Sequence, residues 1–322
     1  MGDGFRHPGS LPEDRRIVKC PHGSALCGAS TEVTIEAIPH IDHPAWSYPS
    51  MERLRYLRHL IIDMDGVLWR GKRPMEGLTD FFDFLRRREI RFVLVTNNAS
   101  RSRMDYVEQL ARFGVRVHPE EVLPSCDATA LYLQQIASPG ARVFVVGEKA
   151  LREAIAAAGF QVVEEERADF VVVGIDWGLT YERLARAARA IWNGARFIGT
   201  NPDPVWPGED GLYPGNGATL AFLERATGVA PLVVGKPEPL MFRLAMERMG
   251  ATPENTAVVG DQIPTDIVGG KRAGLTTILV LSGATTREML AENLVKPDFV
   301  FADIRELMSA WEAVLTDASP GR

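Results

Sequence analysis

The sequence predicts an α/β fold in which helices cover a parallel sheet, and two observations lead to this prediction. From residue 51 onward, short apolar segments of strand length alternate with amphipathic segments of helix length, a pattern typical of consecutive β-α-β units. The chain has 322 residues, of which 46% are hydrophobic, enough to form the cores of two globular domains. We therefore expect a helix-covered parallel sheet, with enough chain left for a second domain.

The first part of the alternation ends at residue 136. Ser100 is expected to cap one of its helices, because a serine hydroxyl can accept from the free N–H groups of a first helical turn. Ser138, Pro139 and Gly140 then interrupt the helical pattern. The expected elements of this part are strands at 60–62 and 91–98 and helices at 76–88, 101–114 and 126–136.

A smaller alternation follows, with strands at 142–146, 161–163, 170–174 and 195–199 and helices at 149–158 and 181–193. Residues 201–217 form a long loop with four prolines and four glycines, and a loop of that length in a compact chain is usually functional or disordered. The remaining elements are helices at 218–227, 238–249, 264–273 and up to 315, and strands at 232–234, 256–259, 277–281 and 299–301.

Residues 1–50 differ from the rest of the chain. They hold six prolines, five glycines and four of the six histidines without any periodic pattern, so we expect a disordered extension. A zinc site is the alternative, but the spacing matches no compact zinc module. We expect Met51 to be the natural start, which mass spectrometry of the native N-terminus would test. The residues of the alternative zinc site are Cys20, His22, Cys27, His40 and His43.

Composition excludes several functions. The net charge of −6 and a chain without a basic run argue against nucleic-acid binding. The longest apolar runs, such as residues 170–175, are too short to cross a bilayer, and no signal-peptide core is present. Three cysteines in a chain of this length do not form a disulfide framework. We expect a cytoplasmic protein without a membrane or nucleic-acid partner.

Asp63 and Asp65 follow the first predicted strand. Residues two apart in an extended chain point the same way, so both carboxylates leave the strand end together. They repel each other unless a cation lies between them or one is protonated, and Gly66 then allows a sharp turn. The alternative for this stretch alone is a plain Asx-type turn.

Three further polar clusters also follow predicted strands. Carboxyl ends of parallel strands meet at one edge of a sheet, so all four clusters are expected to converge there. Each cluster alone could be a helix cap or an ordinary turn, but four in order point to phosphate chemistry. The three clusters are Thr96-Asn97-Asn98, Gly235-Lys236-Pro237 and Gly260-Asp261 with Asp266.

Phosphate chemistry needs these residue types. A carboxylate can attack an anionic phosphate ester only if positive charge neutralises the approach, which Mg²⁺ held by acidic oxygens and a lysine supply. Asp63 is the candidate nucleophile and would form an aspartyl-phosphate. Asp65 is the candidate acid and base, a role worth about 10²- to 10⁴-fold. Backbone N–H groups after the strands would complete the phosphate site.

The four motifs resemble those of the haloacid dehalogenase-like (HAD) phosphatases, and the resemblance covers residues 54–316. Closer similarity is to the type IIA subgroup, which includes nitrophenylphosphatases and phosphatases of phosphoglycolate, pyridoxal phosphate and nucleotides. The stretches that carry it are Asp-Gly-Val-Leu-Trp at 65–69, Gly-Thr-Asn-Pro-Asp at 199–203, Pro-Gly-Asn-Gly at 214–217 and Gly-Lys-Pro-Glu-Pro-Leu-Met-Phe at 235–242.

The resemblance implies a role for each matching residue. It makes Asp63 the nucleophile and Asp65 the acid and base, and both bind Mg²⁺, Asp65 through its backbone carbonyl. Asp261 is the third metal ligand from the protein, and Asp266 is an acid that helps to hold the site. The phosphate-binding residues that it implies are Thr96, Asn97 and Lys236.

The family also inserts a cap domain between its second and third motifs. We therefore expect a three-layer Rossmann-like core at 51–136 and 231–322 and a smaller α/β cap at 137–230. Its substrate-specificity loop runs from Asp203 to Tyr213 and places Trp206 where pyridoxal phosphate phosphatases have a histidine. Trp206 either contacts the substrate or packs the cap against the core. Dimerisation through the cap occurs in the family, so a homodimer is one expected assembly.

The resulting expectation is a Mg²⁺-dependent phosphatase acting on small phosphorylated metabolites. The expected substrates are 4-nitrophenyl phosphate, phosphoglycolate, a sugar phosphate or a nucleotide. The alternative is a catalytically weak sensor or regulatory protein that binds a phosphorylated metabolite. Such a sensor would be expected to have lost Asp63, Asp65 or Lys236, and all three are present.

Overall fold

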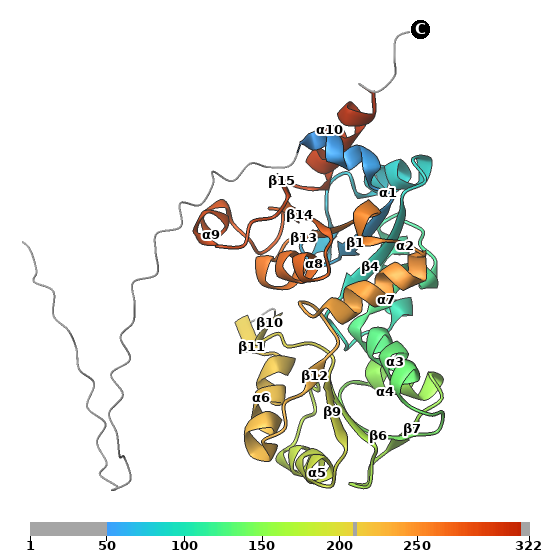
Figure 1. Ribbon diagram of the computed structural model, residues 1–322, viewed down its shortest axis with the longest axis vertical. Helices are drawn as coiled ribbons and strands as arrows, with labels where there is room; N and C mark the ends of the chain where they lie inside the picture. Colours follow the sequence, from blue (N-terminus) through green and yellow to red (C-terminus); the bar gives the residue numbers. More distant parts are fainter. Residues whose placement is uncertain (1–49, 209–210, 317–322) are drawn as a thin grey trace, which may run out of the picture. The chain divides into compact units, whose positions relative to one another are not determined.

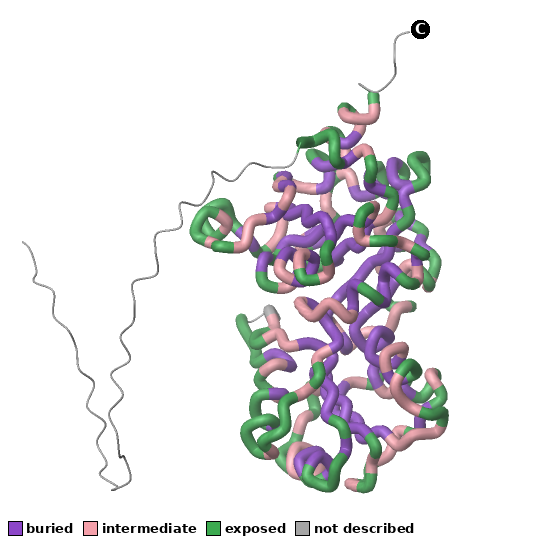
Figure 2. The backbone as a smooth tube through the Cα atoms, viewed as in Figure 1, coloured by how far each residue is buried: buried purple, intermediate pink, exposed green. Residues whose placement is uncertain are grey.

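The computed structural model describes residues 50–208 and 211–316. All described residues belong to one unit of the chain, Ser47–Arg322. The predicted disordered extension and its alternative zinc site therefore lie outside the described residues, apart from Ser50. In this unit, buried residues concentrate along the strands and on one side of most helices (Figure 2).

The main sheet has six parallel strands in the order β15-β14-β13-β1-β4-β5 (Figure 1). The central strand, β1, lies between β13 and β4. Its position gives the residues after β1 neighbours on both sides. The strands are β1 (His59–Asp63), β4 (Arg91–Thr96), β5 (Val122–Pro124), β13 (Thr256–Gly260), β14 (Thr276–Val280) and β15 (Phe299–Phe301).

Helices cover both faces of this sheet. Side chains alternate along each strand, so Leu60 and Ile62 lie in one hydrophobic cluster and Ile61 lies in another. Helices α1 (Leu78–Arg87), α2 (Arg103–Arg112) and α10 (Ile304–Thr316) contribute to the first cluster with the 3₁₀ turn η1 (Met51–Tyr56). Helices α3 (Ser125–Ile136) and α7 (Pro239–Met249) contribute to the second. The predicted three-layer α/β class is confirmed.

A second parallel sheet has the order β12-β9-β8-β6-β7. Its apolar side chains also alternate: Val145 joins the cluster that contains Ile61, and Phe144 lies in a third cluster with α5 and α6. The strands are β6 (Arg142–Val146), β7 (Gln161–Val163), β8 (Phe170–Val173), β9 (Arg196–Gly199) and β12 (Leu232–Val233). The helices are α4 (Lys149–Ala157), α5 (Tyr181–Trp192) and α6 (Asn216–Thr227).

The structure corrects one assignment of the predicted domain limits. They placed the strand near residue 232 in the core, but β12 pairs in parallel with β9 at the edge of the second sheet. Two residues are too few to show by pattern alone which sheet a strand joins. The limits at 50, 136 and 230 otherwise stay a prediction.

Several shorter elements also differ from expectation. Ser102, not Ser100, caps α2, in a capping box with Asp105, whereas the Ser100 hydroxyl donates to Asn98 Oδ1. The predicted loop at 201–217 contains a hairpin, and the predicted helix at 264–273 begins as a π-helical turn. Strand β5 and turn η1 were not predicted. The other elements that differ from expectation, or were not predicted, are hairpins β2 (Trp69–Arg70)–β3 (Arg73–Pro74) and β10 (Val205–Gly208)–β11 (Gly211–Pro214), turns η2 (Pro119–Glu121), η3 (Pro253–Asn255) and η4 (Ile263–Ile267), and helices α8 (Val268–Arg272) and α9 (Arg287–Glu292).

Candidate active site

Three of the four polar clusters lie at the carboxyl end of the main sheet. Asp63 is the last residue of β1, Thr96 is the last residue of β4, and Asp261 follows β13 directly. Because β1 pairs in parallel with both β4 and β13, these residues meet at one edge of the sheet. The predicted convergence therefore holds for these three clusters.

Lys236 reaches the same place from the second sheet. It follows β12 by three residues, so the expectation that all four clusters follow strands of one sheet was wrong. The turn before it is held by main-chain hydrogen bonding, since Gly235 N donates to Thr200 O at 2.9 Å. A Cβ on Gly235 would lie 2.6 Å from Asn97 Oδ1. The turn therefore requires glycine at this position.

The lysine is buried between two carboxylates. Its Nζ donates to Asp63 Oδ1 and, at 2.7 Å, to Asp266 Oδ1. Lys236 is 3% exposed, Asp63 5% and Asp266 0%. Burial alone lowers the pKa of Lys236, but Asp266 and Asp63 outweigh it and hold that pKa well above its ordinary value. The lysine therefore stays charged, which a neutralising group beside a nucleophile requires.

Asp63, Asp261 and Asp266 form a group of carboxylates that could hold a metal ion. One oxygen from each lies within 4.8 Å of the others. Burial raises the pKa of Asp63, with further increases from Asp266 and Asp261. Burial, followed by Asp266, raises the pKa of Asp261 to about 7. Carboxylates packed this closely remain ionised more easily when a cation lies among them.

The donor set fits a hard divalent cation. Among residues 50–208 and 211–316, the buried Asp261 Oδ1 has no hydrogen-bond partner, while Asp261 Oδ2 accepts from Ala284 N at 2.6 Å. An unpaired buried carboxylate oxygen is costly, and coordination would satisfy it. Oxygen ligands of this kind suit Mg²⁺ or Ca²⁺.

Replacing Asp261 with asparagine is expected to stabilise the protein in EDTA at neutral pH. The folded-state pKa of about 7 exceeds the ordinary 3.8, so between these pH values the unfolded chain releases a proton that the folded protein keeps. The stability of the wild type therefore falls as pH rises from about 4 to 7. Asp261→Asn removes this penalty and is expected to raise Tm by about 5 °C at pH 8 and by less at pH 5.

Thermal unfolding in EDTA at both pH values measures this difference. Asp127→Asn is the control. Asp127 is also buried but pairs with Arg103 at 2.7 Å, so loss of this ion pair is expected to lower Tm. Added Mg²⁺ should stabilise the wild type more than Asp261→Asn. A Tm difference between wild type and Asp261→Asn that is equal at pH 5 and pH 8 would contradict the raised pKa of Asp261.

Asp65 and Thr96 lie beside this group. Asp65 is exposed, unlike Asp63, and its Oδ1 accepts from Trp69 Nε1 at 2.8 Å. Its side chain does not belong to the three-carboxylate group. Thr96 is buried, and its hydroxyl accepts from Asn98 N at 3.2 Å.

The Asn97 side chain connects the two sheets. Its Nδ2 donates to Asp203 Oδ1 at 3.0 Å and to Lys236 O at 2.9 Å, and its Oδ1 accepts from Lys236 N at 2.8 Å. Both amide protons are thus used. A contact from Asn97 to phosphate, as predicted, would therefore have to come from its main chain. Asp203 was predicted to belong to the substrate-specificity loop, and its carboxylate accepts this hydrogen bond from Asn97.

Sequence reasoning missed the segment after β14. A Cβ on Gly283 would lie 1.9 Å from Asp261 Oδ2, so this position admits only glycine. The neighbouring main chain holds Asp261 through Ala284 N and through Thr285 N, which donates to Asp261 O at 3.2 Å. The available signal was a small polar pair, Ser282 and Gly283, directly after an apolar strand.

Three aromatic side chains meet at the carboxyl end of the second sheet. Trp206 and Tyr213, both predicted in the specificity loop, face each other across the β10–β11 hairpin. Trp177, in the segment after β8, contacts them edge-to-face with ring centroids 6.0 and 6.2 Å away. Trp177 was not predicted. It is 53% exposed and Tyr213 42%, so the aromatic cluster of Trp177, Trp206 and Tyr213 is open to solvent.

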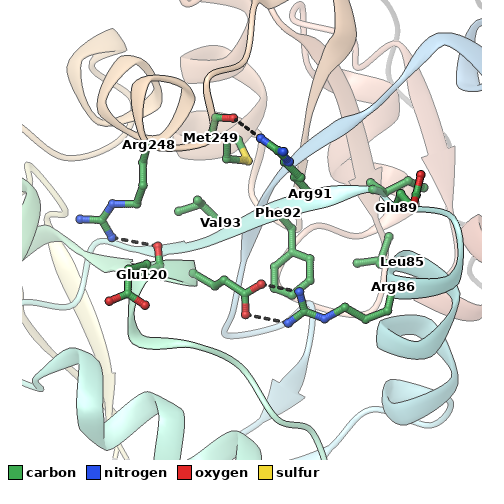
Figure 3. Close-up of a pocket in the computed structure, with 11 residues that line it drawn as sticks. Leu85, Arg86, Glu89, Arg91, Phe92, Val93, Glu120, Arg248 and Met249 are labelled. Atoms are coloured by element: carbon green, nitrogen blue, oxygen red, sulfur yellow. Dashed lines mark hydrogen bonds and ion pairs between the residues drawn. The ribbon is translucent and has the colours of Figure 1, made fainter.

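A hollow of about 680 Å³ lies at the opposite end of β4 (Figure 3). Its arginines are already bonded to the protein: Arg86 pairs with Glu121, Arg91 donates to Met249 O, and Arg248 donates to Val122 O. It contains none of the predicted site residues. The hollow is therefore separate from the candidate site at the carboxyl edge of the sheet.

Comparisons with known proteins agree with this geometry. The model of the haloacid dehalogenase-like hydrolases matches residues 60–161, and a model described as HAD-hydrolase-like matches residues 233–307. An acid sugar phosphatase from Staphylococcus aureus is 38% identical over 259 residues, which are 80% of this chain and 100% of that protein. The chain belongs to the haloacid dehalogenase-like hydrolases. The resemblance inferred from the four motifs is confirmed.

Solved structures of this HAD family are also similar. A 4-nitrophenylphosphatase from Thermotoga maritima is 38% identical with a TM-score of 0.77, covering 80% of this chain and 98% of that chain. A glycerol phosphate phosphatase from Mycobacterium tuberculosis, in complex with magnesium, is 36% identical with a TM-score of 0.74, covering 81% and 79%. The HAD protein described here is an enzyme, a phosphoric monoester hydrolase.

Proposed function

We propose that this phosphatase hydrolyses small phosphate monoesters through an aspartyl-phosphate on Asp63, with Mg²⁺ as its cofactor. The observation that carries the proposal is the buried contact of Lys236 with Asp63 and Asp266, beside the unpaired oxygen of Asp261. The positive charge of Lys236 balances the negative charge of the Asp63 carboxylate, so Asp63 can act as a nucleophile when an anionic phosphate approaches.

Each residue then has a defined task. Asp63 attacks phosphorus, and Lys236 neutralises charge on the attacking carboxylate and the phosphoryl oxygens. The Thr96 hydroxyl and the backbone N–H groups after β4 bind those oxygens. Asp65 gives a proton to the leaving oxygen and later takes one from the attacking water.

Asp63, Asp261 and the backbone carbonyl of Asp65 would hold Mg²⁺, and Asp266 would keep Lys236 and the acidic group in place. When bound, Mg²⁺ supplies charge neutralisation at the phosphoryl oxygens. The buried unpaired oxygen of Asp261 is the feature of this chain that supports such a ligand set.

We further propose that the leaving group of the substrate lies against the aromatic cluster. Asp203 binds Asn97, the neighbour of Thr96, and Trp206 follows Asp203 by three residues. Three extended residues span at most about 10 Å, so Trp206 lies close along the chain to the segment that binds Asn97. Flat, half-exposed rings favour a planar leaving group such as an aryl group or a base.

Trp206→Ala is expected to lower kcat/KM for 4-nitrophenyl phosphate by about 5- to 10-fold, because a stacked ring loses its contact. Glycerol phosphate has no ring, so its kcat/KM should change little. Trp192→Ala is the matched control, since Trp192 is an exposed tryptophan on α5. Equal losses with both substrates would assign Trp206 to packing instead.

The proposal as a whole is tested by measuring phosphate release from a panel of esters with Mg²⁺ and with EDTA. The panel comprises 4-nitrophenyl phosphate, phosphoglycolate, a sugar phosphate, glycerol phosphate and a nucleotide. Turnover that requires the metal supports the proposal. Stoichiometric binding without turnover by folded, metal-loaded protein would favour the sensor, the second candidate function.

Location and assembly belong to the same proposal: a cytoplasmic enzyme that forms a homodimer through its cap. The described cysteine, Cys126, is buried and unpaired with another cysteine. None of the helices in the described ranges is long and apolar enough to cross a membrane. Sedimentation of the purified protein would test the dimer.

A further inference from the structure

Trp69 makes a contact with Asp65 to which the sequence motifs assign no role. The indole Nε1–H donates to Asp65 Oδ1 at 2.8 Å. The turn between the two residues is closed by Gly66 N, which donates to Trp69 O at 2.8 Å. Gly66 has φ +85°, which glycine adopts without strain. The five-residue turn Asp65–Trp69 therefore places the indole against the carboxylate.

The indole itself is held firmly. Trp69 is 1% exposed. Its ring stacks on Tyr106 with centroids 6.4 Å apart and an interplanar angle of 19°, and it contacts Phe113 at 6.1 Å. Arg101 covers the Tyr106 ring at 4.5 Å. A donor on so restrained a ring defines one orientation of the carboxylate that it binds.

The two oxygens of Asp65 have different surroundings. Oδ1 accepts from Trp69, and that is the carboxylate's one hydrogen bond within the described part of the chain. Asp65 is exposed although Asp63, two residues earlier, is buried. Its Oδ2 is thus the oxygen left to meet a substrate.

We propose that Trp69 is a positioning residue that holds Asp65 so that Oδ2 exchanges the catalytic proton. The inference rests on the proposed role of Asp65 as acid and base. In the first step the Asp63 carboxylate forms a bond to phosphorus, the ester P–O bond breaks, and the leaving oxygen takes the proton from Oδ2. In the second step water gives a proton to Oδ2 and its oxygen bonds to phosphorus, breaking the bond to Asp63.

The consequence depends on the leaving group. An alkoxide such as that of glycerol is a strong base and needs a proton as it leaves. Nitrophenolate is a weak base and leaves without one. Loss of the orienting N–H should therefore slow alkyl esters and spare aryl esters, because general acid catalysis acts on the departing oxygen.

The experiment compares kcat/KM for glycerol phosphate and 4-nitrophenyl phosphate in Mg²⁺-loaded wild type, Trp69→Phe and Asp65→Asn. The ratio kcat/KM reports steps up to the departure of the leaving group, so the rate of aspartyl-phosphate hydrolysis does not affect the comparison. Trp69→Phe keeps an aromatic ring on Tyr106 but removes the donor. We expect a loss of about 10- to 100-fold for glycerol phosphate and less than about 3-fold for the aryl ester.

Trp311→Phe is the matched control. Trp311 is also 1% exposed, belongs to the same hydrophobic cluster and contacts Phe84 at 5.8 Å, but it lies on α10. Trp311→Phe should not change the ratio of the kcat/KM values for the two esters. Equal losses with both esters in Trp69→Phe, or no loss with either, would overturn the positioning role. If Asp65→Asn is itself unselective, the proposed acid role has failed instead.

Discussion

Asp63→Asn is expected to lower kcat/KM for 4-nitrophenyl phosphate by on the order of 10⁴- to 10⁶-fold, the scale seen when a covalent nucleophile is removed. An amide cannot form the aspartyl-phosphate, and the remaining residues can only bind the ester. The fold should survive, because asparagine has the same shape and the buried like charges around Asp63 are relieved. Substrate binding in Mg²⁺ should therefore remain measurable.

Acid quenching during turnover separates this result from misfolding. The wild type should carry acid-stable, hydroxylamine-sensitive phosphate on one site, and Asp63→Asn should carry none. Asp127→Asn controls for loss of a buried carboxylate, because Asp127 is 7% exposed on α3 and pairs with Arg103. Turnover by Asp63→Asn within about 10-fold of the wild type would exclude the covalent mechanism.

Lys236→Met is expected to have the second largest effect, a loss of about 10³-fold in kcat/KM, the upper end for removing one charge-stabilising donor. The same substitution leaves Asp63 and Asp266 buried without their cation. Breaking a buried pair from one side costs about 3–5 kcal/mol. We therefore expect lost stability in EDTA, part of which Mg²⁺ restores.

Kinetics and urea unfolding measure the two effects in parallel. Lys271→Met is the matched control, because Lys271 pairs with Asp298 at 3.3 Å with its side chain 32% exposed. A pair that water screens contributes about 0–1 kcal/mol, so this variant should keep both activity and most of its stability. An active Lys236→Met enzyme would show that Asp63 needs no lysine beside it.

Local pattern sufficed for five of the six strands of the main sheet, all except β5, and for three of its polar clusters. Apolar strands such as 59–63 and 256–260 are buried on both faces, as their continuous apolar runs predict. Parallel pairing then brings Asp63, Thr96 and Asp261 to one edge without further information. The caps were less certain, because Ser100 and Ser102 both carry a suitable hydroxyl and only the hydrogen-bond geometry distinguishes them.

Contacts between residues far apart in the chain could not be read in the same way. Nothing local shows that β12 joins the second sheet, that Gly283 packs on Asp261, or that Trp177 meets Trp206. Each of these contacts depends on how two segments that are far apart in sequence fold against each other.

The sequence by itself determined the α/β class, the family and the residue types at the strand ends, because strand length, alternation and short motifs are local properties. Only the tertiary structure decided which groups meet. It placed Lys236 between Asp63 and Asp266, and it used both amide protons of Asn97 in hydrogen bonds to Asp203 and to Lys236 O. It also left Asp261 Oδ1 without a hydrogen-bond partner among the described residues. Hydrogen bonds and charges act over a few ångströms, and folding alone brings residues more than a hundred positions apart to that distance.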